Sequence, residues 1–488
     1  MRFYEIIPGL TAWITLLGLV FLSWKMPAVV VFFILLYDLY WILKLFYLFS
    51  HLRFAFLKMR KHLQINWWEK IQTENLPWEN IYHLVILPFY KEPKEVIEES
   101  VNSLVSARYP KEKIFVVLAS EERGGENDQK NAFLIQEKFK SQFGDFLITI
   151  HPQNIPYELP GKGSNESFAA KEAIKKIIDV RSIPYENVLV SSFDIDTKIE
   201  KDYFGVLTYH FLKEKNNLNA SYQPIPIFIN NIEQTTFFTR LIAFSATFWQ
   251  LMQSSRPEWL VSFSSHSLPL KALVDVGFWE TYLVSEDSRI FFQCLNYYNG
   301  NWRAVPLFYP VYMDAVSGKN FWEAMKNLYK QQRRWAWGVE NFVYLLRDFK
   351  NNHSISFWKK FSWMAVMFNG FYSWSTSSFI IFLFGVLPNI LGSDVFKRSI
   401  LSYNLPRYTG IMLNLSTIGI IISAVLTLIL ISYKVKNFKK RYYFLYFIEW
   451  LLMPIVFVVF GALPALDAQT RLMLGGKARL GFWRTPKG

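Results

Sequence analysis

Two pairs of acidic residues carry the clearest chemical signal in this sequence. Asp194 and Asp196 are separated by one residue and directly follow a short apolar run. Two carboxylates with this spacing at a strand end point the same way and can hold a divalent ion, because Mg²⁺ and Mn²⁺ bind a few carboxylates together with substrate phosphate oxygens. Glu286 and Asp287 form the second pair. A carboxylate there could accept the proton of an incoming hydroxyl, although the pair would serve equally well as the acidic first turn of a helix.

A lysine in a glycine-containing segment could contact a phosphate group. Lys162 lies between Gly161 and Gly163. A Walker A loop would need a glycine where Pro156 stands and a serine or threonine where Gly163 stands. The sequence therefore argues against an ATP-hydrolysing P-loop and leaves a lysine that can lie beside a diphosphate.

A third element combines amides, arginines and a tryptophan in the run Gln331-Gln332-Arg333-Arg334-Trp335. Arginine offers a planar fork that fits a diphosphate, and the face of a tryptophan is a good platform for a sugar ring. The alternative is a basic helix face whose arginines reach toward the lipid headgroups, with the tryptophan at the same level.

These residues need a scaffold, and four short apolar runs predict one. The runs lie at 84–87, 114–118, 146–150 and 188–190 and are separated by polar, helix-compatible stretches. This alternation predicts parallel βαβ units with helices on both faces of a sheet. In such sheets the ligand binds beyond the carboxyl ends of the strands.

The residues that follow the first two strands are therefore candidates for the ligand site. They are Pro88, Tyr90 and Glu92 after the first strand and Glu121 after the second. An ordinary turn between a strand and a helix would explain them equally well.

Long apolar runs flank this region and predict a membrane protein, in agreement with a content of 52% hydrophobic and 18% aromatic residues. A span needs about 20 apolar residues. The sequence predicts about five spans, at 7–24, 28–49, 361–391, 409–431 and 443–463. The second run holds Asp38, which is costly inside a bilayer unless it is paired or faces water.

The predicted organisation has five parts along the chain. They are two N-terminal transmembrane helices at 1–52, a cytosolic α/β domain at 53–320, amphipathic helices at the membrane interface at 321–360, C-terminal transmembrane helices at 361–465 and a basic tail at 466–488.

The formal net charge of +14 has a pattern that favours a membrane surface over nucleic acid. Much of the positive charge lies beside apolar runs, as it does in the cytoplasmic loops of membrane proteins. The cluster at 434–441 and the tail after 466 are both basic, yet a span at 443–463 would put them on opposite sides, and the sequence leaves this conflict open. The single cysteine, Cys294, excludes an internal disulfide and a zinc site made of cysteines.

Taken in order, these motifs resemble the membrane-bound family 2 glycosyltransferases, which include cellulose, chitin and hyaluronan synthases. The resemblance covers residues 80–340 and rests on Pro88 to Glu92, Glu121, Gly161 to Asn165, Asp194 to Asp196, Glu286-Asp287 and Gln331 to Trp335. It implies a Rossmann-like α/β domain of the GT-A type in the cytosol, inserted between transmembrane helices of the cell (plasma or inner) membrane. It also implies an inverting, metal-dependent transfer of a sugar from a nucleotide sugar, of the UDP-sugar kind, to a growing polysaccharide.

The resemblance assigns roles on the donor side. Glu121 would lie near the nucleoside and Lys162 near the uracil or diphosphate, and Asp194 would touch the ribose and diphosphate. Asp196 would be the direct ligand of Mg²⁺ or Mn²⁺, with Asp194 beside it. The remaining donor contacts would come from Pro88, Tyr90, Glu92, Asn165, Gln331 and Arg334.

On the acceptor side the resemblance makes Asp287, next to Glu286, the general base, and it places Trp335 and His266 against the acceptor. Two departures matter. Glu121 stands where many relatives carry aspartate, and the segment Phe263 to Ser267 does not match the acceptor segment of a known synthase.

Two alternatives therefore stay open. The same motif set also resembles that of non-processive glycosyltransferases that act on a membrane lipid. A transporter with a cytosolic regulatory domain is the alternative outside the enzymes, and the intramembrane Asp38 is its only support.

Overall fold

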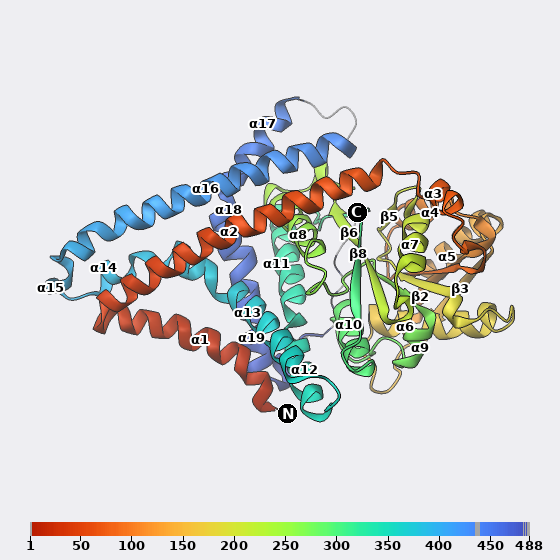
Figure 1. Cartoon of the computed structure of the whole chain (residues 1–488), viewed down its shortest axis with the longest axis horizontal. Coiled ribbons are helices and arrows are strands. Elements are labelled where there is room, and N and C mark those ends of the chain that lie inside the picture. The colour runs from red at the N-terminus through yellow and green to blue at the C-terminus, as the bar shows by residue number, and fades with distance from the viewer. Residues whose placement is uncertain (1, 435–439, 482, 484, 486–488) are drawn as a thin grey trace.

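The computed structural model describes residues 2–434, 440–481, 483 and 485, and it places an α/β domain at one end of a set of long helices (Figure 1). The predicted basic residues at 435–439, Arg484 and Lys487 lie outside the described residues.

The four predicted strands form the parallel part of the sheet. They are β1 (Tyr82–Pro88), β2 (Ile114–Glu121), β3 (Asp145–His151) and β4 (Val188–Ser192), in the spatial order β3-β2-β1-β4. Every residue of β2 and β4 is buried, because helices cover both faces of the sheet. The expected α/β architecture is confirmed.

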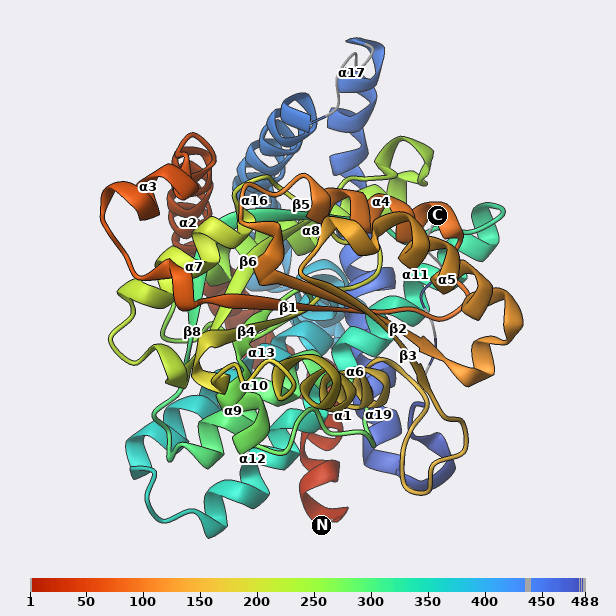
Figure 2. The same ribbon diagram turned by 90° about the vertical axis from the view of Figure 1, so that its right-hand side faces the viewer.

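Alternate side chains of these strands fill two separate cores. On one face Val85 and Leu87 of β1 pack with α4 (Lys94–Val105), α5 (Glu126–Phe139) and α7 (Tyr203–Lys213). On the other face Leu84 and Ile86 pack with α6 (Lys162–Ala173), α9 (Leu270–Asp275) and α10 (Glu286–Tyr297). The period of two along a strand explains this division. Both layers are visible in Figure 2.

The other half of the sheet is mixed, whereas the sequence predicts only parallel strands. It comprises β5 (Lys198–Ile199), β6 (Ala220–Phe228), β7 (Ser267–Pro269) and β8 (Arg303–Met313), and the whole order is β3-β2-β1-β4-β7-β6-β8-β5. The short β7 lies antiparallel to both β4 and β6. Pro224 and Pro226 interrupt the strand signal of β6, since proline cannot donate to a ladder, and the pairing of β6 with β8 has an irregularity between Gln223 and Ile225.

Long apolar helices precede and follow the domain. Before it come α1 (Arg2–Lys25) and α2 (Pro27–Leu63), which meet at Met26. After it come α13 (Phe357–Phe382), α14 (Leu387–Leu391), α15 (Asp394–Lys397) and α16 (Ile400–Lys434), and then α17 (Lys440–Glu449), α18 (Met453–Val456) and α19 (Leu463–Leu474). Among the described residues four helices are long and apolar enough to cross a membrane, or five candidates with the α13–α14 pair, which is bent by 47°. The length and composition of these helices are typical of a membrane protein.

Two amphipathic helices join these parts. They are α11 (Phe321–Ala336) and α12 (Glu340–Asn351). The side chain of Asn320 accepts a hydrogen bond from the Glu323 N–H and caps the start of α11. Helix α11 packs against α19, so the segment that carries Gln331 to Trp335 lies between the domain and the last apolar helix.

A buried ion pair also fastens the domain to the C-terminal helices. Arg240 of α8 (Phe237–Ser254) donates to both carboxylate oxygens of Glu449, at 2.9 Å from Nε to Oε2. The Arg240 guanidinium lies 4.4 Å from the ring centroid of Tyr446. Both charged side chains are buried, so each charge depends on the other.

Removal of one partner of this pair should destabilise the protein strongly. We expect Glu449→Gln to lower the free energy of unfolding by about 3–5 kcal/mol, because an unpaired buried charge remains. The control is Glu98→Gln, which removes an ion pair with Lys138 at the surface. The unfolding midpoint in detergent should fall markedly in the first variant and hardly at all in the second, and equal midpoints would refute the argument.

Candidate active site

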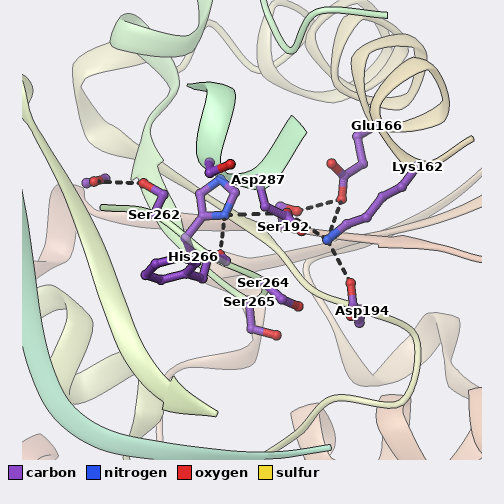
Figure 3. A network of polar contacts seen from close by, with 12 residues as sticks. Lys162, Glu166, Ser192, Asp194, Ser262, Ser264, Ser265, His266 and Asp287 are labelled. Atoms are coloured by element: carbon purple, nitrogen blue, oxygen red, sulfur yellow. Dashed lines mark hydrogen bonds and ion pairs between the residues drawn. The ribbon is translucent and has the colours of Figure 1, made fainter. Parts of the chain in front are cut away.

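The ammonium group of Lys162 lies at the centre of the candidate site. Its Nζ is 2.7 Å from Oδ1 of Asp194 and 2.8 Å from Oδ1 of Asp287, and Oε1 of Glu166 is 3.7 Å away (Figure 3). Asp194 follows β4, Asp287 lies in the first turn of α10, and Lys162 and Glu166 belong to α6. Three segments far apart in the sequence thus bring one cation and three carboxylates together at the carboxyl end of the parallel strands.

Local packing fixes the start of α6. The Asn165 side-chain amide donates to the Ala119 carbonyl oxygen at 2.8 Å, which ties α6 to the end of β2. Gly163 allows α10 to come close, since a Cβ at this position would lie 3.0 Å from the Cβ of Glu286. The glycine after Lys162, which rules out a Walker A loop, therefore has a packing role.

The charges at this site depend strongly on one another. Burial alone would lower the pKa of Lys162, but the carboxylates of Asp194, Asp287 and Glu166 outweigh it and hold that pKa well above its ordinary value. Burial raises the pKa of Glu166 well above its ordinary value, and the Ser192 hydroxyl donates to this carboxyl at 2.5 Å. Sequence reasoning missed Glu166 and Ser192, although Glu166 follows Lys162 by one helical turn.

Glu286 and Asp287 differ in their surroundings although they are neighbours in the chain. Burial, followed by the charge of Asp287, raises the pKa of Glu286 to about 7. Asp287 keeps 23% of its side chain exposed. A substrate can therefore reach Asp287, while Glu286 lies beneath the surface.

His266 lies inside the site and not on an open surface. Its ring is fully buried, and its Nδ1 is 2.8 Å from the Phe263 carbonyl oxygen and 3.7 Å from Oδ1 of Asp287. Burial lowers the pKa of this imidazole, so the neutral ring donates from Nδ1 to the carbonyl oxygen. Among the described residues its Nε2 has no hydrogen-bond partner. The resemblance predicts an acceptor contact for His266, and the structure places its buried ring beside Asp287.

The two aspartates after β4 also differ. Asp194 has 22% of its side chain exposed. Asp196 is fully buried, and its Oδ2 accepts a hydrogen bond from the Asp314 N–H at 2.8 Å. Within the described ranges no group of three or more His, Cys, Asp or Glu side chains is arranged to hold a metal ion. The residues fit Mg²⁺ or Mn²⁺ bound through one or two carboxylates plus phosphate oxygens of a ligand, the usual arrangement for Mg²⁺.

The loops after β1 and β2 form a second cluster. Pro88 ends β1. Glu121, at the end of β2, accepts hydrogen bonds from Arg123, one of them 2.8 Å from Nη2 to Oε1. The Arg123 guanidinium lies 4.1 Å from the ring centroid of Tyr90, and Glu92 accepts from the Tyr90 N–H. The structure thus joins the predicted residues of both loops through Arg123, which sequence reasoning missed because Tyr90 lies far from it in the chain.

Helix α11 presents its motif toward the same region. Gln331 is buried, whereas Arg334 and Trp335 are partly exposed. The charge of Arg334 lowers the pKa of Glu286, against the larger effects of burial and Asp287 that raise it. Within the described part of the chain the Arg334 Nε has no hydrogen-bond partner. The ring of Trp335 lies 6.0 Å from that of Phe228, measured between centroids.

Comparisons with known proteins add a family match. The family model described as glycosyl transferase family group 2 matches residues 189–463, more than half of the chain. No curated protein matches the chain.

Solved structures with some similarity include the mannosyltransferase PcManGT from Pyrobaculum calidifontis in complex with GDP-Man and Mn²⁺. It is 13% identical with a TM-score of 0.41, and the match covers 86% of this chain and 96% of that one. TarS 1–349 from S. aureus in complex with UDP-GlcNAc is 17% identical with a TM-score of 0.39, and the match covers 70% of this chain and 90% of that one.

The titration of Glu286 gives a test of this electrostatic description. Its pKa in the folded protein is about 7, above the ordinary value of about 4.3. The folded state therefore holds a proton that the unfolded chain releases. This contribution to stability is present below about pH 4 and is lost as the pH rises through 7. In Glu286→Gln the free energy of unfolding should fall less steeply with pH in this range. Its slope should differ from that of the unmodified protein by at most about 1.4 kcal/mol per pH unit.

The unfolding midpoint should be measured between pH 5 and pH 8 for both proteins. Glu126→Gln is the matched control, since Glu126 is also the first residue of a helix but is exposed. The control should keep the slope of the unmodified protein. A Glu286→Gln variant with that same slope would contradict the assignment.

Proposed function

Because the chain belongs to glycosyl transferase family group 2, we propose that it transfers a sugar from a UDP-sugar to a growing polysaccharide at the membrane, with inversion at the anomeric carbon. Membership of this family makes the protein a glycosyltransferase and its α/β domain a GT-A domain. The observation that carries the finer proposal is the convergence of Asp194 and Asp287 on Lys162 at the carboxyl end of the parallel strands.

The donor would occupy the region between the strand ends and α11. Asp194 and Asp196 would hold Mg²⁺ or Mn²⁺ together with the diphosphate, and the bound ion would stabilise the negative charge of the leaving group. Lys162 and Arg334 would face the diphosphate, with Gln331 beside them. The loop cluster of Tyr90, Glu92 and Glu121, with Pro88 and Asn165 behind it, would contact the nucleoside.

This position of the donor explains why Lys162 lies among carboxylates. Its ammonium compensates Asp194 and Asp287, which would otherwise repel each other and the diphosphate. When the donor binds, the same ammonium can turn toward the phosphate oxygens. The guanidinium of Arg334 is partly exposed, and its Nε has no partner among the described residues. Such a group is available to bind an anion.

Asp287 would be the general base. The acceptor hydroxyl oxygen attacks the anomeric carbon as the bond from that carbon to the diphosphate oxygen breaks, and the electron pair leaves with UDP. The hydroxyl proton passes to Asp287, whose side chain is accessible. Attack from the face opposite to the leaving group inverts the configuration. Lys162 holds the carboxylate in place, the buried His266 ring lies 3.7 Å from it, and Trp335 would provide the platform for the acceptor sugar.

The identity of the acceptor determines whether the product is a polysaccharide or a glycolipid. A membrane lipid acceptor would use the same donor contacts and the same base, so it is the alternative to a polysaccharide. We further propose that the domain is cytosolic and the membrane is the cell (plasma or inner) membrane, because the end of α2 that enters the domain carries His51, Arg53, Lys58, Arg60 and Lys61.

The reaction can be tested with purified protein in nanodiscs, Mg²⁺ or Mn²⁺ and a panel of UDP-sugars. We expect metal-dependent UDP release with one sugar. Asp287→Asn should lower the rate by about 10²–10⁴, the usual contribution of a general base, and Asp196→Asn should lower it as well. The control Asp145→Asn changes an aspartate at the opposite end of the strands, at the start of β3, and should retain full activity.

The chain length of the product separates a polysaccharide from a glycolipid. Full activity in Asp287→Asn would contradict the proposed base.

The acceptor platform can be tested on one helix with two tryptophans. Trp335→Ala should raise the KM for the acceptor about fivefold, because loss of a stacking contact costs about 1 kcal/mol, and should leave the KM for the donor unchanged. Trp322→Ala is the matched control, since Trp322 lies on the same helix and is exposed. Equal acceptor kinetics in the two variants would exclude Trp335 from the acceptor site.

A further inference from the structure

The last apolar segment, 442–474, is long and apolar enough to cross a membrane, and its contacts define its course. A spanning segment must have its two ends on opposite sides of the bilayer. The other membrane helices provide reference points for the two sides.

The side that faces the α/β domain is defined by α1 and α2. Helix α2 ends in the domain, where Leu52 and Met59 pack with α8. Helix α1 runs back along α2 from the break at Met26, and Ile7, near its start, packs against the core that contains Phe342 of α12. The start of α1 therefore lies on the domain side, and the break at Met26 lies on the far side.

The bent pair α13–α14 and the helix α16 cross between these two sides. Trp363, near the start of α13, packs against Phe291 and Phe292 of the domain. At the other end, a Cβ on Gly392 would lie 3.3 Å from the Cβ of Pro27, next to the far-side break. Helix α16 returns from there, and Ile431 near its end joins the core around α8.

The first part of 442–474 lies on the domain side. Glu449 forms the buried ion pair with Arg240 of α8. The next residue, Trp450, stacks on Phe248 of the same helix, with 5.9 Å between ring centroids.

The last part of the segment lies on the domain side as well. Arg2, at the start of α1, donates to the Leu474 carbonyl oxygen at 3.0 Å, and Arg479 pairs with Glu5. Before this end, Asp467 accepts from Arg333 of α11 at 2.9 Å. Both ends of the segment are thus fastened to elements on one side.

The direction of the segment agrees with its contacts. In Figure 1 the column of α18 and α19 runs at a steep angle to α2 and α16, and in Figure 2 it extends from α17 at the top to α19 near the bottom. Helix α19 packs against the first half of α1, where the Trp13 Nε1–H donates to the Thr470 hydroxyl at 2.9 Å. A 3₁₀ turn at Trp450–Leu452 and a π-helical turn at Phe457–Ala462 interrupt it.

We propose that 442–474 does not cross the bilayer but lies in its interface on the domain side, with one face in the lipid. Of the five candidate spans among the described residues, with the bent pair counted as one, the last is then no span, and Arg2 and Arg479 lie together on the side of the domain. Phe444, Ile448, Leu451 and Ile455 are exposed and follow one another at intervals of four, three and four residues, so they share one face of a helix. The acyl region of the bilayer that α1 and α2 cross is the partner that fits this apolar stripe.

This arrangement also removes the charge conflict of the tail. Lys477 and Arg479 then lie on the same side as Arg53 and Lys58, as basic residues beside membrane helices prefer. The proposal concerns the path of the chain and does not depend on which acceptor the enzyme uses.

Cysteine labelling of the full chain in sealed membrane vesicles tests the proposal. In a Cys294→Ser background, single cysteines would be placed by Lys477→Cys in the tail, Tyr157→Cys in the domain and Val395→Cys on the far side. Tyr157 and Val395 are 96% and 84% exposed. A membrane-impermeant maleimide would be added to vesicles of each orientation, before and after addition of detergent.

We expect Lys477→Cys to react in the same vesicles as Tyr157→Cys and to be protected wherever Val395→Cys reacts. Reaction of Lys477→Cys in the same vesicles as Val395→Cys would overturn the proposal. Peptide tags at the two ends of the unmodified chain give an independent measurement, because the proposal requires protease to reach both from the same side. Protease access to the two tags from opposite sides would also overturn it.

Discussion

The arrangement of the domain depends on one partly buried cation that three carboxyl groups surround. Lys162 lies within hydrogen-bond distance of Asp194 and Asp287, and Glu166 is close behind. Carboxylates removed from water repel one another unless a cation compensates them. The start of α6, the end of β4 and the start of α10 must therefore meet, and the sheet order that places β4 beside β1 brings them to one edge. This requirement also gives the site its chemistry, since the same charges can bind a diphosphate and accept a proton.

The sequence allowed the parallel half of the domain to be predicted because its strands are buried on both faces. Continuous apolar runs such as 114–118 have few alternatives at that length. The mixed half escaped prediction for physical reasons: β7 has three residues, and β6 contains two prolines that argue against a central strand. In the site, Lys162, Asp194 and Asp287 could be singled out by residue type and position after a strand or before a helix. The buried partners Glu166 and Ser192 could not, because only the tertiary structure brings them together.

The membrane part shows a different limit of sequence reasoning. Hydropathy measures whether a helix prefers lipid, but it does not distinguish a helix that crosses the bilayer from one that lies in its surface. The polar contacts of Glu449 with Arg240 and of Asp467 with Arg333 contain that information. They connect the last apolar segment to α8 and α11. The helix that carries Arg334 and Trp335 is therefore held between the catalytic domain and a segment immersed in lipid, where a membrane-bound acceptor would arrive.

The central claim is that Lys162 marks the place where the donor diphosphate binds. A structure of the full chain with Mn²⁺ and UDP, with the ion located by its anomalous scattering, tests this most directly. We expect the ion beside the Asp194 and Asp196 carboxylates and the diphosphate in contact with Lys162 and Arg334. An ion and nucleotide bound elsewhere, with Lys162 still held between Asp194 and Asp287, would contradict it.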